Sequence, residues 1–361
     1  MKKSLIALAV LASAGAASAQ SSVTLFGVVD TAITYSRAAN ASKTALTGGG
    51  YNSNRLGFRG TEDLGGGMSA SFWLEAGYNS DNGTGSGTNT NNQVSGGATA
   101  AAGTQGLTFN RRATVSLAGG WGEVRLGRDY TPQFWNRTVF DPFGTVGVGA
   151  SQADASALGG PVSVRASNSV GYFLPGNLGG FYGQYQHYLG ENNSNSVVTG
   201  TTIGNKNDGV GDGVRVGYAN GPANAAIAYA NTRYATGNIK NFNLGGQWDF
   251  GVAKLMGEYQ RDRVSSTPSV TGKGYLIGGL VPVGPGEIRL AYSQYKTDAL
   301  GGPKTKKVSV GYVHNLSKRT ALYTTYANVR NSGGATAALN GQTANPGGKA
   351  GGFDFGVRHS F

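Results

Sequence analysis

Apolar and polar residues alternate with a period of two along most of the chain, and long stretches with helical periodicity are absent. Within residues 241–250, one face carries Phe242, Leu244 and Trp248, while polar residues occupy the other face. A period of two places successive side chains on opposite faces of a β-strand. The pattern therefore predicts an all-β protein whose strands have one apolar and one polar face.

The connections between these strands alternate between short and long. Tight turns are predicted at 62–66, 119–122, 175–179, 219–222, 250–251, 282–286 and 315–318. Long polar stretches rich in Gly, Asn, Ser and Thr lie between them, for example at 79–106, 190–212 and 331–348. A water-soluble β-sandwich shows the same alternation along its strands. Short turns at one end and long loops at the other are instead typical of outer-membrane barrels.

The pattern predicts sixteen strands, an even number, with both chain ends at the short-turn side. Their expected ranges are 22–37, 53–61, 67–79, 107–118, 122–129, 165–174, 180–189, 212–219, 223–234, 239–249, 252–263, 272–281, 286–297, 305–314, 319–330 and 350–361. Barrels of this size enclose an aqueous channel. We therefore predict a single 16-stranded antiparallel transmembrane β-barrel with long external loops.

The N-terminus has the features of a secretory signal peptide. Lys2 and Lys3 precede a short apolar run, and Ala17-Ser18-Ala19 resembles a cleavage site. The run is far shorter than the roughly 20 residues that a membrane-spanning helix needs. We expect residues 1–19 to be removed and residues 20–361 to form the barrel after export.

Composition supports strands over helices and gives the chain a basic character. The chain has 62 glycines in 361 residues, no cysteine, and 13% charged residues, against roughly 25% in typical globular chains. The formal net charge of +12 falls to +10 when Lys2 and Lys3 leave with the signal peptide. Nucleic acid is a poor candidate partner, because the chain is exported and lacks a dense Lys/Arg cluster. The positive charge instead predicts a field that attracts small anions.

One long connection, residues 128–165, carries aromatic side chains that a solvated loop would leave exposed. Tyr130, Phe134 and Trp135 lie within it, followed by Phe140 and Phe143. Connections of this length without their own secondary structure are usually functional or disordered, and these side chains need burial. We expect this third external loop to fold into the lumen and narrow it.

Several motifs resemble the general porins of Gram-negative outer membranes, in particular the beta-proteobacterial type. These motifs lie at residues 22–30, 54–65, 111–117, 122–128 and 353–361, and so cover the whole mature chain. The resemblance implies a homotrimer. We expect no cofactor, and contact with outer-membrane lipid and lipopolysaccharide. The resemblance also implies that loop carboxylates face a basic barrel wall, and that the terminal Phe361 is read by the barrel-assembly machinery.

Strand parity predicts which charged residues reach the lumen. Arg55 and Arg59 alternate with Leu56 and Phe58, so we expect both arginines to face inward. A charged side chain on the lipid face costs about 2–4 kcal/mol at mid-membrane. The predicted inward charged groups, including two at strand ends, are Arg37, Arg55, Arg59, Glu75, Arg112 and Arg128. Arg111 has outward parity, but it lies near a strand end, where it can bend inward.

The expected acidic side of this constriction is the inward loop. Asp141 and Asp154 are its candidates, with Asp129 a further one. Family porins carry a Pro-Glu-Phe-Gly phrase here, whereas this chain has Asp-Pro-Phe-Gly at 141–144. Opposed charges across a narrow opening create a transverse field that orients polar solutes. An alternative role for the same arginines is to hold the loop by pairing with its carboxylates.

Signatures of enzymes are missing from the sequence. His187, His314 and His359 lack metal-ligand spacing, and the chain has neither a thiol nor a Gly-x-Ser-x-Gly elbow. We therefore expect a passive channel for small hydrophilic solutes and ions, with a modest preference for anions. The alternatives are a substrate-specific channel, and a plugged barrel that acts as an adhesin or an enzyme.

Overall fold

The computed structural model describes residues 22–93, 106–152, 158, 160–193 and 206–361. The predicted signal peptide and Asp154 lie outside these residues. No helix among them is long and apolar enough to cross a membrane.

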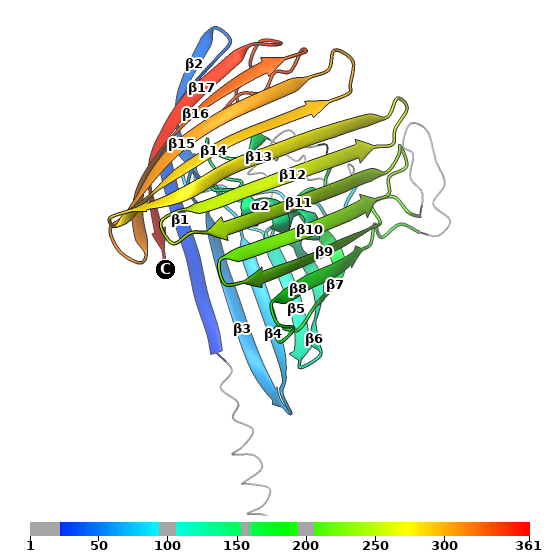
Figure 1. The fold of residues 1–361 in the computed structure, drawn as a ribbon. Helices are drawn as coiled ribbons and strands as arrows, with labels where there is room; N and C mark the ends of the chain where they lie inside the picture. Colours follow the sequence, from blue (N-terminus) through cyan, green and yellow to red (C-terminus); the bar gives the residue numbers. More distant parts are fainter. Residues whose placement is uncertain (1–21, 94–105, 153–157, 159, 194–205) are drawn as a thin grey trace, which may run out of the picture.

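Seventeen strands in the described part form one antiparallel sheet that closes on itself, because β1 pairs with both β17 and β3 (Figure 1). The strands are β1 Ser22–Ala38, β2 Ala41–Gly48, β3 Arg55–Gly65, β4 Met68–Ala76, β5 Arg112–Gly119, β6 Gly122–Tyr130, β7 Arg165–Phe173, β8 Phe181–Tyr188, β9 Gly211–Asn220, β10 Ala223–Thr232, β11 Ile239–Asp249, β12 Lys254–Val264, β13 Val270–Val283, β14 Gly286–Thr297, β15 Lys304–Asn315, β16 Thr320–Ser332 and β17 Lys349–Ser360. Closure leaves no unpaired edge, which lipid would not tolerate.

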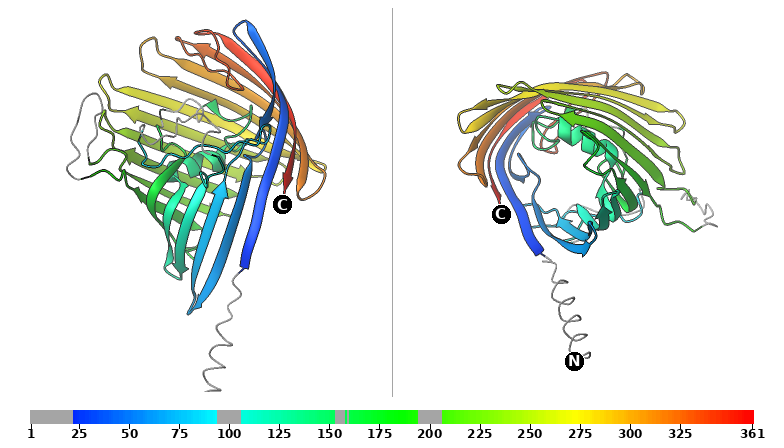
Figure 2. Two further views of the ribbon diagram at one scale, coloured as in Figure 1. Left: turned by 180° about the vertical axis from the view of Figure 1, so that it is seen from behind. Right: turned by 60° about the horizontal axis from the view of Figure 1, so that its bottom comes forward.

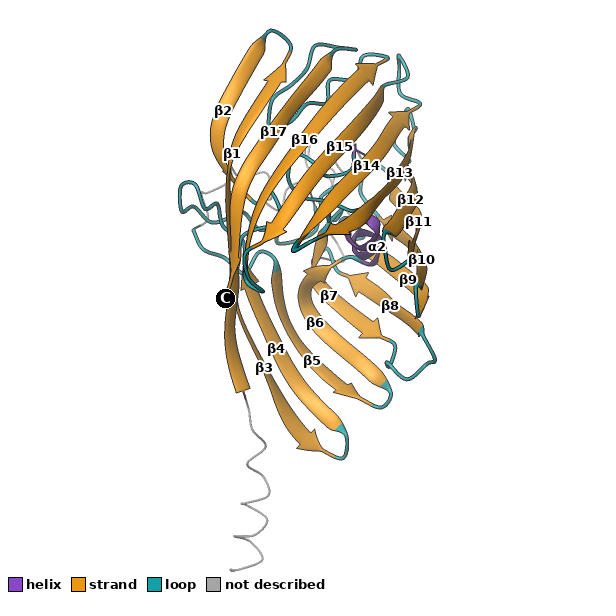
Figure 3. Cartoon of the chain, turned by 60° about the vertical axis from the view of Figure 1, so that its left-hand side comes forward, coloured by secondary structure: helices purple, strands orange, loops and turns teal. Residues whose placement is uncertain are grey.

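Two of the seventeen strands share one position in the barrel. β2 pairs with the second half of β1, and β3 pairs with the first half, so β2 and β3 follow each other along the same side (Figure 3). The barrel therefore has sixteen strand positions, as predicted. The expectation of a loop throughout 38–52 was wrong, because a tight turn after Ala38 returns the chain directly into β2. The segment 49–54, which connects β2 to β3 along this position, is not a strand.

The predicted division between short turns and long loops is confirmed. The short connections occur at 66–67, 120–121, 174–180, 221–222, 250–253, 284–285 and 316–319. The longest lie at the opposite end, at 77–111, 131–164, 189–210 and 333–348. Residues 107–111 were expected to be strand, but they belong to the loop 77–111, and β5 begins only at Arg112.

The two faces of the barrel differ in the way that the alternation predicted. On β1, Val23 and Ile33 turn outward with 67% and 54% of their surface exposed, whereas Asp30 and Thr34 turn inward and are buried. Exposed apolar side chains recur on the outer face of strands all around the barrel. A surface of this extent is stable in hydrocarbon and would drive aggregation in water. The wall therefore fits a membrane outside and a polar interior.

The loop 131–164, which was predicted as the third external loop, contains a helix, α2 (Pro132–Phe140), that lies within the ring of strands (Figure 2). Proline at the first helical position fits because its missing N–H has no partner there in any helix. Phe134, Arg137 and Phe140 are among its buried side chains. The expectation that this loop lacks its own secondary structure was therefore wrong. A short helix lets the backbone satisfy its own polar groups while its side chains reach the wall.

Candidate functional site

The loop 131–164, here called the inward loop, is fixed to the inner wall by side chains of α2. Asn136 donates from Nδ2 to the carbonyl of Ala226 on β10, at 3.0 Å. Its Oδ1 accepts a short hydrogen bond from the Arg215 guanidinium on β9. Asn243 on β11 donates to the carbonyl of Gln133, at 2.9 Å. Three neighbouring strands therefore hold the helix in place.

Glycines on the inner face give the inward loop the space to approach the wall. A Cβ added at Gly245 would lie only 2.1 Å from the ring of Phe140. Glycines on other strands meet loop side chains in the same way, namely Gly213 with Pro132, Gly278 with Pro142 and Gly311 with Phe143. The loop therefore follows the wall from β9 to β15, and the absence of side chains at these positions makes that path possible.

Asp141, which the sequence suggested as a charge facing the pore, is used within the inward loop. Its carboxylate accepts hydrogen bonds from the backbone N–H groups of Phe143, Thr145 and Ser151, at 2.8–3.2 Å. The residue is only 3% exposed. Close by, Lys307 on β15 donates from Nζ to the carbonyl of Ala150 at 2.7 Å. Asp141 therefore shapes the loop rather than facing the arginines across the lumen.

The opposite wall carries a cluster of arginines around Glu75. Glu75 and Arg112 are direct cross-strand partners of β4 and β5, so both side chains share the lumen face. The Glu75 carboxylate accepts a short hydrogen bond from Arg111 Nε, and Arg55 lies 3.8 Å away. Trp73 Nε1 donates to the second oxygen at 3.0 Å. Arg111 has bent inward from the strand end, as its position allowed.

Tyr130 connects this cluster to the inward loop. Its hydroxyl oxygen accepts hydrogen bonds from Arg111, at 2.8 Å, and from Arg165, at 2.9 Å. The Arg165 guanidinium also lies over the ring, 4.4 Å from its centre. On the other side, the ring stacks on Phe134 of α2 at 5.0 Å. The point where the inward loop leaves the wall is therefore a junction of arginines and aromatic rings.

Arg59 and Arg112 flank Trp73 on the lumen face. Their guanidinium carbons lie 5.1 and 4.5 Å from the tryptophan ring, in the range of cation–π contacts. Arg112 is also 3.6 Å from Asp129, and Asp129 pairs more closely with Arg125, at 2.6 Å. The carboxylate of Asp129 is therefore shared between two arginines of the wall, while Arg59 is exposed.

Two arginines expected in the wall are placed elsewhere. Arg37 lies on the outer face, because the alternation of β1 continues without a bulge to its end, and its cross-strand partners are Gly351 and Ser42. Arg128 falls at a β-bulge of β6. Its guanidinium donates to the carbonyl of Asn110 and to the hydroxyl of Ser167. Arg128 therefore binds the loop 77–111 and β7 rather than Glu75 or Asp129.

Other basic residues line the lumen although we did not single them out for the site. Arg289 and Arg358 lie over the ring of Tyr51, at 4.4 and 5.1 Å. Tyr51 belongs to the segment 49–54, which is held because Asp30 accepts its backbone N–H and that of Asn52. Strand parity would have found Arg289, since its neighbour Leu290 faces outward. The position of Tyr51 had no signal in the sequence.

Taken together, the described lumen has one side built from the inward loop and another built from arginines. Three carboxylates lie among these arginines: Glu75 and Asp129 are each within 4 Å of two guanidinium groups, and Glu123 is 2.9 Å from Arg125. No group of three or more potential metal ligands occurs in the described residues. The arrangement can attract and orient small anions.

Comparison with known proteins places these features in a family. The family model described as Gram-negative porin matches residues 4–334. Outer membrane porin protein 32 of Delftia acidovorans is 39% identical over 379 aligned positions, which cover both chains completely. An outer membrane porin protein of Bordetella pertussis is 31% identical, and the match covers 90% of this chain and 93% of that protein. The structure of an anion-selective porin from Comamonas acidovorans, 35% identical, superposes with a TM-score of 0.81 over 95% of this chain and 100% of that one.

Proposed function

The chain belongs to the Gram-negative porins, channel proteins of the outer membrane, and from this premise we propose that its lumen passes small hydrophilic anions in preference to cations. The observation that carries the proposal is the excess of guanidinium groups on the lumen wall around Glu75 and Asp129. Five arginines of this wall, Arg55, Arg59, Arg111, Arg112 and Arg125, outnumber the three carboxylates Glu75, Glu123 and Asp129, so the remaining positive field extends into the pore. The similarity to a porin described as anion-selective supports the same direction.

The pore constriction is proposed to lie between the inward loop and the arginine wall. Arg55, Arg59 and Arg112 are its basic members, together with Arg111. Glu75 anchors them and reduces their net charge. Because both oxygens of Asp141 accept backbone N–H groups, the inward loop contributes shape there rather than an opposing charge. The proposed selectivity therefore arises from an excess of positive charge on the wall more than from opposite charges facing each other across the pore.

A planar bilayer measurement tests this function. The folded protein is inserted into a bilayer under a salt gradient, and the reversal potential is recorded. We expect stepwise conductance and a reversal potential of the sign that anion flux produces. A reversal potential of cation sign contradicts the selectivity, and absence of conductance contradicts the channel itself. Saturable block by one solute would favour a substrate-specific channel, and an activity without conductance would favour a plugged barrel.

Further proposals concern processing and assembly. We expect cleavage after Ala19, which N-terminal sequencing of the protein from outer membranes will test. We also propose a homotrimer in lipid and lipopolysaccharide. The exposed apolar residues Leu25, Phe72 and Val115, on the outer face of β1, β4 and β5, are available for such an apolar contact. Three conductance levels that close in sequence would support three pores in one unit.

A further inference from the structure

A row of positive charges crosses the outer face of the barrel near the external loops. Arg261, Lys273, Lys296 and Lys304 lie on the adjacent strands β12, β13, β14 and β15. They are direct cross-strand partners in sequence: Arg261 opposite Lys273, Lys273 opposite Lys296, and Lys296 opposite Lys304. We call these four residues the cation row.

The row faces away from the lumen. On β13, Lys273 shares its parity with Tyr275 and Ile277, whose side chains are exposed on the outer surface. On β15, Lys304 shares its parity with Val308 and Val310, which are also exposed. The same face carries further cross-strand pairs of cations, Lys240 with Arg263, Lys306 with Arg330, and Arg330 with Lys349.

Such a row is electrostatically unfavourable for the barrel alone. Directly opposite residues of an antiparallel pair have Cβ atoms roughly 5 Å apart, and like charges there are destabilising. Within the described residues, no carboxylate lies within salt-bridge distance of Lys273, Lys296 or Lys304. The nearby Asp298 accepts the backbone N–H of Thr271 instead. The lumen arginines around Glu75, by contrast, have carboxylate partners. An external anion would therefore stabilise the row.

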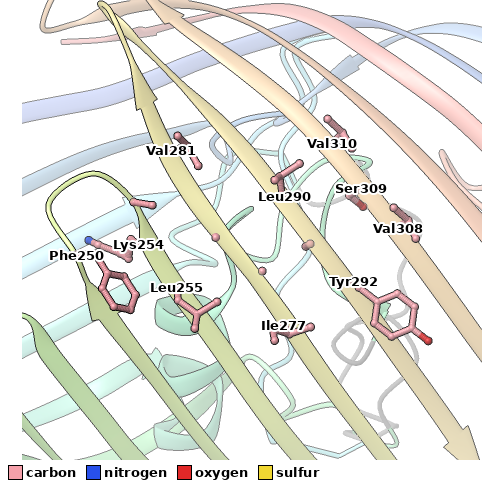
Figure 4. A pocket seen from close by; sticks show the side chains of 14 residues that line it. Phe250, Lys254, Leu255, Ile277, Val281, Leu290, Tyr292, Val308, Ser309 and Val310 are labelled. Atoms are coloured by element: carbon pink, nitrogen blue, oxygen red, sulfur yellow. The ribbon is translucent and has the colours of Figure 1, made fainter.

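An apolar groove lies on the same strands, between the level of the cation row and the short turn 250–253 (Figure 4). Leu255, Ile277, Leu290 and Val308 line it, and its volume is about 560 Å³. Gly279, which has the outward parity of Ile277, contributes no side chain, so the outer wall is hollowed between the flanking residues. The groove runs across β12 to β15, which are the strands that carry the cation row.

The spacing between row and groove matches an amphipathic molecule. Lys273 and Ile277 are four residues apart on β13, which corresponds to roughly 13 Å at about 3.3 Å per residue. Tyr275 lies between them, and its ring centre is 6.0 Å from that of Tyr292, which is the cross-strand partner of Ile277 and lines the groove. Tyrosine rings are typical of the boundary between hydrocarbon and head groups. The charges are therefore at head-group level, and the groove is at the level of acyl chains.

From these observations we infer that the cation row and the groove bind one phosphorylated glycolipid of the outer leaflet. Its phosphates would lie between the opposed lysines, and one acyl chain would fill the groove. The same face of a second copy fits poorly as the occupant, because a two-fold contact would oppose two positive rows. A soluble anion would leave the apolar groove without a role. The inference extends the general contact with lipopolysaccharide to a defined site.

The test compares binding of lipid A, a phosphorylated and multiply acylated disaccharide, by native mass spectrometry of the full-length mature protein in detergent. We expect K273Q/K296Q to bind at least about tenfold more weakly than the parent, since each basic residue near an anionic surface contributes about 1 kcal/mol. The matched control is K318Q/R319Q, which removes two exposed charges at the periplasmic turn 316–319 and should bind like the parent.

Two modified probes identify the part of the lipid that is recognised. Dephosphorylated lipid A and deacylated phosphodisaccharide should each bind at least about tenfold more weakly than the intact lipid. Equal binding of the dephosphorylated form, or of K273Q/K296Q, would overturn the site. Equal binding of the deacylated form would show that the row binds phosphate alone, which contradicts a lipid as the occupant. A change of oligomeric state in K273Q/K296Q would show that the row contacts protein, which also contradicts the inference.

Thermal unfolding provides a second readout that does not depend on the pore. Without lipid, K273Q/K296Q should melt at the same temperature as the parent or higher, because like-charge repulsion has been removed. With lipid A, the parent should gain more thermal stability than the variant. A lower melting temperature of the lipid-free variant would show that the lysines stabilise the barrel themselves, which contradicts the inference. Bilayer conductance should be equal in both proteins, so failure of the channel proposal is recognised separately.

Discussion

At the scale of single residues, the sign of the electrostatic potential in the lumen depends on which groups pair with its carboxylates. Glu75 accepts hydrogen bonds from Arg111 and Trp73, and Asp129 pairs with Arg125. Arg59, by contrast, contacts aromatic rings and remains exposed. An arginine on an aromatic surface keeps its full charge available to a passing ion. We therefore expect Arg59 to influence selectivity more than the arginines that are paired with carboxylates.

Replacing Arg59 by glutamine should reduce the preference for anions. A unit charge about 4 Å away changes the energy of an anion and of a cation by about 1 kcal/mol each, in opposite directions, in water. The anion-to-cation permeability ratio should therefore fall by up to about 30-fold. The reversal potential in a planar bilayer measures this ratio. The matched control is R37Q, which removes the same charge from the outer face. An equal effect of both substitutions would mean that overall protein charge, rather than the lumen wall, sets the selectivity.

At the scale of elements, α2 depends on the wall strands that receive it. Asn136 and Gln133 connect the helix to β9, β10 and β11, and Phe140 fills the space over Gly245. A helix of nine residues is too short to be stable by itself in water. Its position in the lumen is therefore a property of the surrounding barrel, and changes in the wall should move it.

Substituting Gly245 by alanine should displace α2 from the wall. The new Cβ would overlap the Phe140 ring, and overpacking of this kind typically costs about 1–3 kcal/mol. We expect a lower melting temperature and an altered single-channel conductance. The neighbouring variant G246A is the control, since the nearest atom to its Cβ is 3.6 Å away. If the conductance of G245A equals that of G246A, the inward loop does not set the width of the pore.

At the scale of the whole molecule, the barrel is closed by pairing its first and last strands. β1 and β17 are in register from Val28 to Ala38, and beyond them Gly27 and Phe361 exchange two backbone hydrogen bonds, at 3.1 and 3.2 Å. The Phe361 ring also covers Gly27. The terminal residue is therefore part of the closed structure, in addition to its proposed role in assembly.

The variant F361A separates these two roles. The backbone hydrogen bonds of residue 361 do not depend on its side chain, so we expect refolding into detergent or liposomes to remain close to that of the parent. If the ring is read by the assembly machinery, the amount of folded barrel in outer membranes should fall severalfold. F355A, which removes an outward aromatic ring from the same strand, is the control. A refolding defect as large as the loss in cells would instead assign the ring to closure alone.

The sequence by itself determined the barrel, because each strand repeats the same local rule: apolar residues face lipid and polar residues face the lumen. The rule places Arg55, Arg112 and Glu75 on the inner face, and it would also have placed Arg37 outside and Arg289 inside. It fails where the backbone leaves regular pairing, at the bulge beside Arg128 and in the segment that carries Tyr51.

Only the tertiary structure decided the partners of the charged groups. Asp141 is close in sequence to the proposed constriction, yet its oxygens accept N–H groups of its own loop. The Tyr130 hydroxyl accepts hydrogen bonds from Arg111 and Arg165, which come from different parts of the chain. The inward loop has no repeating pattern, and its path depends on glycines contributed by distant strands. Hydrogen bonds of this kind follow from where the closed barrel brings its segments together, which alternation along one strand does not specify.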